Sequence, residues 1–157
     1  MDCHRRREPP LSYYRNPLFD LYWIHGNQKP GAAQGEATVK DFRQLKVWQK
    51  SHQLALELYR ITASFPRSEA YGLTPQIQRA AVSIPSNLAE GCGRQGDAEL
   101  ARFCNIASGS ASELEYQLLL ARDLKLIKPD DYETLAQQTT EIKRMLTVFV
   151  QKLTAES

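Results

Sequence analysis

Four polar residues that could do chemistry follow one another at helical spacing between positions 83 and 94. Ser83, Asn87, Glu90 and Arg94 lie four, three and four residues apart, so a helix would place them on one side. Such a row could bind an anion or move a proton. Glu and Arg four residues apart, however, more often form a simple ion pair, which contributes about 0.2–0.5 kcal/mol when exposed. We therefore interpret the row as a structural polar network and predict no catalytic residue in it.

The histidine and cysteine residues complete no metal or nucleophile site. His52 is the one histidine after residue 40, and no Glu-x-x-His pair, which a metal site in a helical bundle needs, occurs in the sequence. Cys3, Cys92 and Cys104 have neither CxxC spacing nor an evident His partner, which argues against a zinc ribbon or a disulfide framework and fits a reducing compartment. We predict no cofactor, no metal and no enzymatic activity. An enzyme with an unrecognised site is the less favoured alternative.

Composition indicates a soluble globular chain with little net charge. Of its 157 residues, 42% are hydrophobic and 24% charged, and the formal net charge is +2. Residues 1–40 hold six basic and four acidic side chains, which leaves residues 41–157 with 14 of each. A strongly basic phosphate-binding face is therefore not required, although a local patch could exist. The most apolar short segment, residues 18–24, contains Asp20 and is too short to span a membrane, so we predict a cytoplasmic protein without membrane contact.

Apolar spacing after residue 40 predicts four helices, over residues 42–65, 73–92, 97–125 and 130–154. Three short connections between them predict an all-α fold, an antiparallel up-down-up-down four-helix bundle formed by residues 41–157. Residues 1–40 keep no helical or strand period, and we predict a disordered N-terminal arm. The arm is rich in aromatic residues, which leaves a partner-docking segment, a plain tail and a mis-assigned start open. These aromatic residues are Tyr13, Tyr14, Phe19, Tyr22 and Trp23.

The first predicted helix carries two apolar stripes, whereas one suffices to join a bundle. One stripe contains Leu45, Trp48, His52, Ala55, Leu56, Tyr59 and Ala63. The other, nearly opposite, contains Val47, Leu54, Leu58, Ile61 and Phe65. We predict that the second stripe contacts another subunit, so that Leu58→Glu would dissociate the assembly. The alternative is that the N-terminal arm folds back and covers it.

The next two helices look shaped for close contact. Pro85 removes one backbone donor, yet the apolar phase continues across it through Ile77, Ala81, Ile84 and Leu88, which predicts a bend and not a stop. In the third helix, Gly109 costs about 1 kcal/mol relative to alanine, which indicates a packing role beside Ser110. No phosphate-binding glycine motif occurs here.

Three stretches resemble the four-helix-bundle family of 23S rRNA intervening-sequence proteins. They are DFRQLKVWQKSHQLALELYRIT (41–62), FPRSEAYGLTPQIQRAAVSIPSNLAEGCGR (65–94) and FCNIASGSASELEYQLLLARDL (103–124), and the resemblance extends over about residues 41–154. It implies a bacterial, cytoplasmic, all-helical subunit of a ring-like homopentamer with no established enzymatic activity. The family signature falls on Tyr71, Gly72, Gln76, Arg79, Ser83, Pro85, Asn87, Glu90, Gly91, Arg94, Gly109, Ser110 and Glu113.

The resemblance also implies a link to nucleic acid. A related protein of similar fold, the accessory protein of diversity-generating retroelements, is strongly basic and works beside a reverse transcriptase. The present chain departs from the pattern of its relatives in three ways. Its bundle has no net charge, His52 stands where relatives usually carry a small residue, and the arm of residues 1–40 has no counterpart in the family pattern. We predict a non-enzymatic oligomer that binds RNA, DNA or a nucleic-acid-processing protein. A protein–protein adaptor with no nucleic-acid contact is the alternative. Basic residues that could contact phosphate are Arg67, Arg79, Arg94, Arg102 and Lys125.

Overall fold

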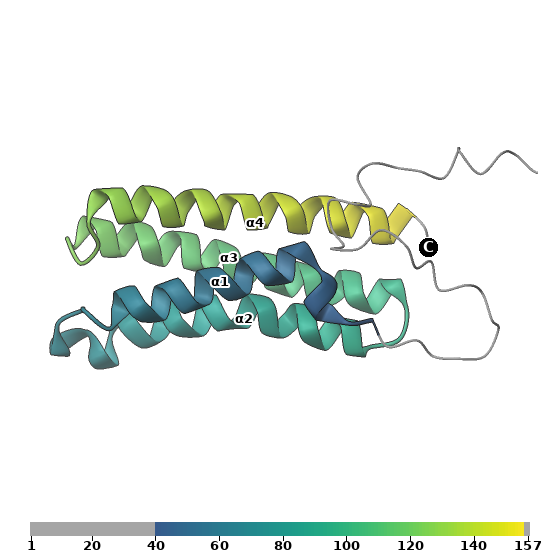
Figure 1. Cartoon of the computed structure of the whole chain (residues 1–157), viewed down its shortest axis with the longest axis horizontal. Coiled ribbons are helices and arrows are strands. Elements are labelled where there is room, and N and C mark those ends of the chain that lie inside the picture. The colour runs from purple at the N-terminus through teal and green to yellow at the C-terminus, as the bar shows by residue number, and fades with distance from the viewer. Residues whose placement is uncertain (1–39, 156–157) are drawn as a thin grey trace, which may run out of the picture.

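The computed structural model describes residues 40–155, which form four long helices. A short 3-10 helix, η2 (Phe42–Gln44), precedes α1 (Lys46–Thr62), and another, η3 (Arg67–Tyr71), precedes α2 (Leu73–Gly93). Two longer helices follow, α3 (Asp97–Asp123) and α4 (Pro129–Ala155). Figure 1 shows the four α-helices running alternately in opposite directions along one long axis, and the described residues contain no strand. The predicted all-α up-down-up-down bundle is confirmed. The predicted disordered arm, residues 1–40, lies outside the described residues except for Lys40.

The first predicted helix, residues 42–65, is divided and shorter than expected. The Asp41 carboxylate accepts a hydrogen bond from the Arg43 amide at 3.0 Å and caps η2, and Leu45 then adopts an extended conformation before α1 begins. At the other end, the amide of Phe65 bonds to the carbonyl of Thr62, which tightens the chain into a turn after α1. The other three helices begin and end within two residues of their predicted bounds, and α2 continues through the buried Pro85.

The end of α3 uses a left-handed residue. Lys125 has a φ of 60°, and the amide of Leu126 reaches back to the carbonyl of Ala121 at 2.9 Å. The amide of Lys125 bonds to the carbonyl of Arg122, also at 2.9 Å. These two bonds form a Schellman motif, in which glycine usually takes the left-handed position because it has no Cβ.

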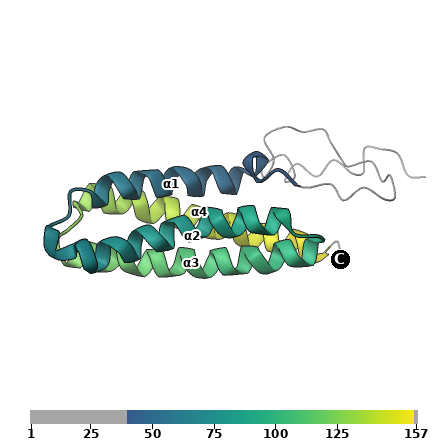
Figure 2. The same ribbon diagram turned by 90° about the horizontal axis from the view of Figure 1, so that it is seen from below.

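The core lies between the helices, with α3 packed against both α2 and α4. The first helix, α1, packs against α2 and, less extensively, against α4, and Figure 2 shows α1 and α3 on opposite sides of the bundle. The apolar stripe predicted for the second helix, Ile77, Ala81, Ile84 and Leu88, is buried, and α3 and α4 bury apolar residues from Leu100 to Leu118 and from Leu135 to Leu153. Within residues 40–155, no helix has the length and apolar character that a membrane crossing would need.

The structure corrects the orientation predicted for α1. Val47, Leu54 and Leu58 are 0%, 1% and 0% exposed and belong to the core of the bundle, so they cannot contact a second subunit. Ile61 and Phe65, from the same stripe, are partly buried against that core. The prediction failed because a helical period locates two stripes without saying which one turns inward. The second stripe points inward. Of the first stripe, Leu45 and Ala55 are also buried and Trp48 is partly buried, while Leu56, Tyr59 and Ala63 are exposed.

Candidate functional site

The polar and charged signature residues of α2 and α3 lie along one surface, which we call the polar seam, whereas Pro85 and Gly91 are buried. Its centre is a direct contact between the two helices, where the hydroxyl oxygens of Ser83 and Ser110 are 2.8 Å apart. The Asn87 amide donates to the Ser83 carbonyl at 2.8 Å and to the Ser83 hydroxyl at 3.1 Å. The Ser110 hydroxyl also donates to the backbone carbonyl of Ile106 at 3.3 Å. Within residues 40–155 the partners of the two hydroxyls are thus a hydroxyl, an amide and a backbone carbonyl, none of which is a base that could activate a serine nucleophile. The seam comprises Gln76, Arg79, Ser83, Asn87, Glu90 and Arg94 of α2 and Ser110 and Glu113 of α3.

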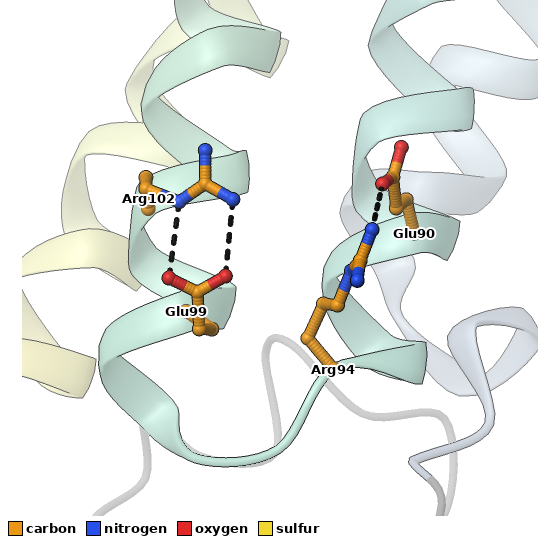
Figure 3. A network of polar contacts seen from close by, with 4 residues as sticks. All are labelled: Glu90, Arg94, Glu99 and Arg102. Atoms are coloured by element: carbon orange, nitrogen blue, oxygen red, sulfur yellow. Dashed lines mark hydrogen bonds and ion pairs between the residues drawn. The ribbon is translucent and has the colours of Figure 1, made fainter.

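At one end of the seam, four charged side chains alternate in sign. Arg94 binds Glu90 at 2.6 Å on α2, while Arg102 binds Glu99 through two hydrogen bonds of 3.0 Å on α3 (Figure 3). The hydrogen bonds from Arg102 lower the pKa of Glu99 and raise the pKa of Arg102 itself. Each carboxylate of the quartet therefore binds an arginine of its own helix, Glu90 to Arg94 and Glu99 to Arg102, as structural ion pairs on a helix do.

The two helices approach closely where the quartet lies. A Cβ added at Gly91 would come within 2.8 Å of the Phe103 Cβ and 2.9 Å of the Leu100 Cδ1. The guanidinium groups of Arg102 and Arg94 lie 4.4 Å and 5.6 Å from the centre of the Phe103 ring and cover it. Gly91 thus lets α2 and α3 meet. Glu99 is not among the predicted site residues, although its i, i+3 spacing to Arg102 in the sequence indicates an ion pair.

The opposite end of the seam holds Gln76, Arg79 and Glu113, all of which are exposed. Glu113 accepts a hydrogen bond of 2.9 Å from the side-chain amide of the buried Gln117, whose own carbonyl oxygen has no donor among the described residues. No ion pair holds Arg79 within residues 40–155.

Gly109 differs from Gly91 because nothing in the described chain lies within 4 Å of the position its Cβ would take. It is exposed on α3, so the packing role predicted for it has no counterpart among residues 40–155.

The two cysteines of the bundle are buried and unpaired. Burial raises the pKa of Cys92 to about 11 and that of Cys104 to about 12. Both side chains therefore stay as thiols at neutral pH, whereas a nucleophile or a metal ligand must be a thiolate. Nowhere in residues 40–155 do three or more His, Cys, Asp or Glu side chains gather in a way that could hold a metal ion.

A second surface, the outer face of α1, consists of Trp48, His52, Leu56 and Tyr59. Leu56 is 53% exposed and Tyr59 48% exposed, although both are large and apolar. The rings of Trp48 and His52 stack with centres 5.0 Å apart and planes inclined by 9°. An open groove of about 610 Å³ adjoins this face and is bounded by α1 and α4. Its lining includes Trp48, Gln49, His52, Gln53, Gln138 and Glu141. These four residues belong to the stripe of α1 that was predicted to face the core.

Comparison with known proteins agrees with the fold. The chain is similar to a protein of unknown function from the S23 ribosomal protein family of Bacteroides thetaiotaomicron, whose crystal structure is known. The two are 29% identical, the match covers 66% of this chain and 97% of that one, and the TM-score is 0.61. No curated protein matches the chain. The sequence model of the 23S rRNA-intervening sequence proteins matches residues 43–148. The protein described by these helices therefore belongs to the 23S rRNA-intervening sequence protein family.

Proposed function

We propose that this chain is a non-enzymatic bundle that assembles with copies of itself and presents the polar seam to RNA, DNA or a nucleic-acid-processing protein. The observation that carries the proposal is the outer face of α1, where Leu56 and Tyr59 are about half exposed beside Trp48 and His52. A homopentamer is the assembly that the family resemblance implies. The bacterial cytoplasm is the matching location, since buried unpaired thiols suit a reducing compartment.

The energetics of that face support self-association. Fully burying a large apolar side chain contributes about 1.5–3 kcal/mol, so Leu56 and Tyr59 would each gain roughly half of that on being covered. A contact confined to two side chains would be too small for a stable assembly. The partner must therefore also fill the adjoining groove beside Gln53 and Gln138.

The charges of the seam limit how it could bind nucleic acid. Of the basic residues suggested for phosphate contacts, Arg94 and Arg102 already bind carboxylates on their own helices. Arg67, Arg79 and Lys125 are exposed, but they are few, and phosphate contacts dominate nucleic-acid affinity. The paired charges favour a second candidate, an adaptor that binds a protein partner with the same seam and does not contact nucleic acid.

Native mass spectrometry of the full chain at low salt, with and without nuclease, tests both candidates. A homopentamer carrying nuclease-sensitive extra mass, and an RNA affinity that falls steeply with added salt, would support nucleic-acid binding. A pentamer with no bound nucleic acid at low salt would refute nucleic-acid binding and favour the adaptor. A monomer at all concentrations would refute self-association.

A pair of matched variants tests the face itself. Leu56→Glu places a charge on the outer face of α1, whereas Leu124→Glu places one on a leucine of nearly equal exposure, 55%, at the end of α3. We expect the first variant to lower the native mass to that of a monomer and the second to leave it unchanged, while both stay helical by circular dichroism. Equal behaviour of the two variants would contradict the assignment of the interface to α1.

A further inference from the structure

The chain that leads into α1 already lies on the outer face of that helix. The Phe42 ring packs against the Trp48 ring with centres 4.8 Å apart, and Trp48 in turn stacks on His52. The Gln49 side-chain amide donates to the backbone carbonyl of Arg43 at 3.1 Å. The first turns of α1 thus bind both a ring and a backbone carbonyl from the residues just before the helix.

The same kinds of group continue along α1 beyond the reach of Phe42. Leu56 and Tyr59 offer apolar surface one and two turns further on, and both are about half exposed. Gln53 lines the adjoining groove with a side-chain amide, the group with which Gln49 binds a backbone carbonyl, whereas the side-chain amide of Gln138 on α4 already donates to the Glu57 carboxylate at 3.1 Å. A continuing extended chain would find apolar contacts and hydrogen-bond partners together on this surface.

Residues 18–24, LFDLYWI, have the composition to fill it, with six large apolar or aromatic side chains in seven positions. Fifteen residues separate Ile24 from Lys40, where the described chain begins. Fifteen residues can span up to about 50 Å, whereas the 17 residues of α1 extend over only about 25 Å. The connection therefore reaches every turn of the helix, and Gly26, Pro30 and Gly31 allow it to reverse direction.

We propose that residues 18–24 dock on the outer face of α1 of their own chain and compete there with a second copy of the protein. The regulatory consequence rests on the proposed self-association, because only then do two occupants share one face. A segment tethered by a connection of this length has an effective concentration on the order of millimolar. A second copy therefore displaces it only by burying more surface, and the N-terminal segment sets the concentration at which copies assemble.

Site-specific photocrosslinking in the full chain tests the docking. Benzoylphenylalanine replaces Tyr59 on α1 or, as a matched control, Tyr116 on α3, since both are exposed tyrosines and α3 does not contact α1. The protein is prepared as an equal mixture of ¹⁴N and ¹⁵N chains that are unfolded and refolded together. Mass spectrometry of the digested products then shows whether each crosslink joins parts of one chain or of two.

We expect crosslinks from position 59 to residues 18–24 within single-label products, and none to that segment from position 116. Trp23→Ser should lower the yield about tenfold, whereas Tyr13→Ser, outside the docking segment, should leave it unchanged. Mixed-label crosslinks to residues 18–24, crosslinks only between two α1 helices, or no crosslink from position 59 would each overturn the proposal.

Native masses of the same samples report separately on self-association. If the single-label crosslinks form and Trp23→Ser lowers the concentration at which copies assemble, docking and competition both hold. A monomer at every concentration, with the crosslinks present, would refute the proposed assembly and the competition while leaving the docking in place.

Discussion

Two leucines on α1, two positions apart, separate the core face of the helix from its outer face. Leu58 is 0% exposed and Leu56 is 53% exposed. Truncating a buried leucine to alanine removes its transfer free energy and leaves a cavity, which together cost about 2–5 kcal/mol. Truncating a half-exposed leucine on the surface of a monomer changes stability by roughly 0.5 kcal/mol or less. We therefore expect Leu58→Ala to cost at least about four times as much stability as Leu56→Ala.

Urea unfolding followed by circular dichroism gives the two free energies of unfolding, and protein concentration separates the folding of one chain from assembly. The loss caused by Leu58→Ala should appear at every concentration, because the cavity lies within one chain. The loss caused by Leu56→Ala should grow as concentration rises, because assembly stabilises the folded state only when copies bind one another. Unchanged m-values would show that both variants unfold over the same surface.

The opposite result would refute the reasoning. If Leu56→Ala cost more than Leu58→Ala at the lowest protein concentration, the stripe that includes Leu58 would be the one facing out. The orientation of α1 described above would then be wrong, and the face originally predicted from the sequence would be the interface.

Three further predictions concern the backbone and the thiols. Gly91→Ala should destabilise the fold by about 1–2 kcal/mol, because its Cβ would press on Phe103. Gly109→Ala should stabilise the fold by about 1 kcal/mol, because alanine favours the helix and nothing lies near its Cβ. Urea unfolding measures both changes in the free energy of unfolding, and two changes of the same sign would contradict the packing described. Lys125→Gly should raise the free energy of unfolding by about 1 kcal/mol, because glycine takes a φ of 60° without strain. A melting temperature below that of the unchanged protein would contradict this prediction. Burial raises the pKa values of Cys92 and Cys104 to about 11 and about 12, so above about pH 9 the unfolded chain loses these protons first. The free energy of unfolding should therefore fall as pH rises from about 9 toward 11. It should fall more steeply than in a variant with alanine at positions 92 and 104. Equal slopes for the two proteins would contradict the raised pKa values of the two cysteines.

The sequence predicted the helices because each needs only a period and a boundary signal. Ile77, Ile84 and Leu88 recur at helical spacing on α2, and the glycine-rich stretch around Gly93 ends that helix within one residue of the predicted bound. Phase also showed correctly that α2 would continue through Pro85. Phase could not orient α1, because a helix with two apolar stripes fits a bundle in two rotations, and only packing against α2 and α4 selects one.

The polar seam was predictable in part. Ser83, Asn87, Glu90 and Arg94 share a face on a single helix, and a period alone reveals this. Their partners on α3 depend on the register of the two antiparallel helices, which places Ser83 opposite Ser110. The apolar and polar pattern of a single helix does not reveal that register. The same register explains why Gly91 and Gly109, both glycines inside helices, differ: one lies under Phe103 and the other opens onto solvent.

The two surfaces lie so that the proposed assembly need not hide the seam. The outer face of α1 points away from the bundle, whereas the seam runs over α2 and α3, and α1 and α3 lie on opposite sides (Figure 2). Copies joined through α1 would therefore leave Gln76, Arg79 and Glu113 accessible on each subunit. Repeating a weak surface in this way raises its overall affinity through effective concentration and needs no new contact. A seam whose charges are mostly paired gains the most from such repetition, because one copy alone offers a partner few free groups. Loss of partner binding in Leu56→Glu, with the seam untouched, would be the signature of this dependence.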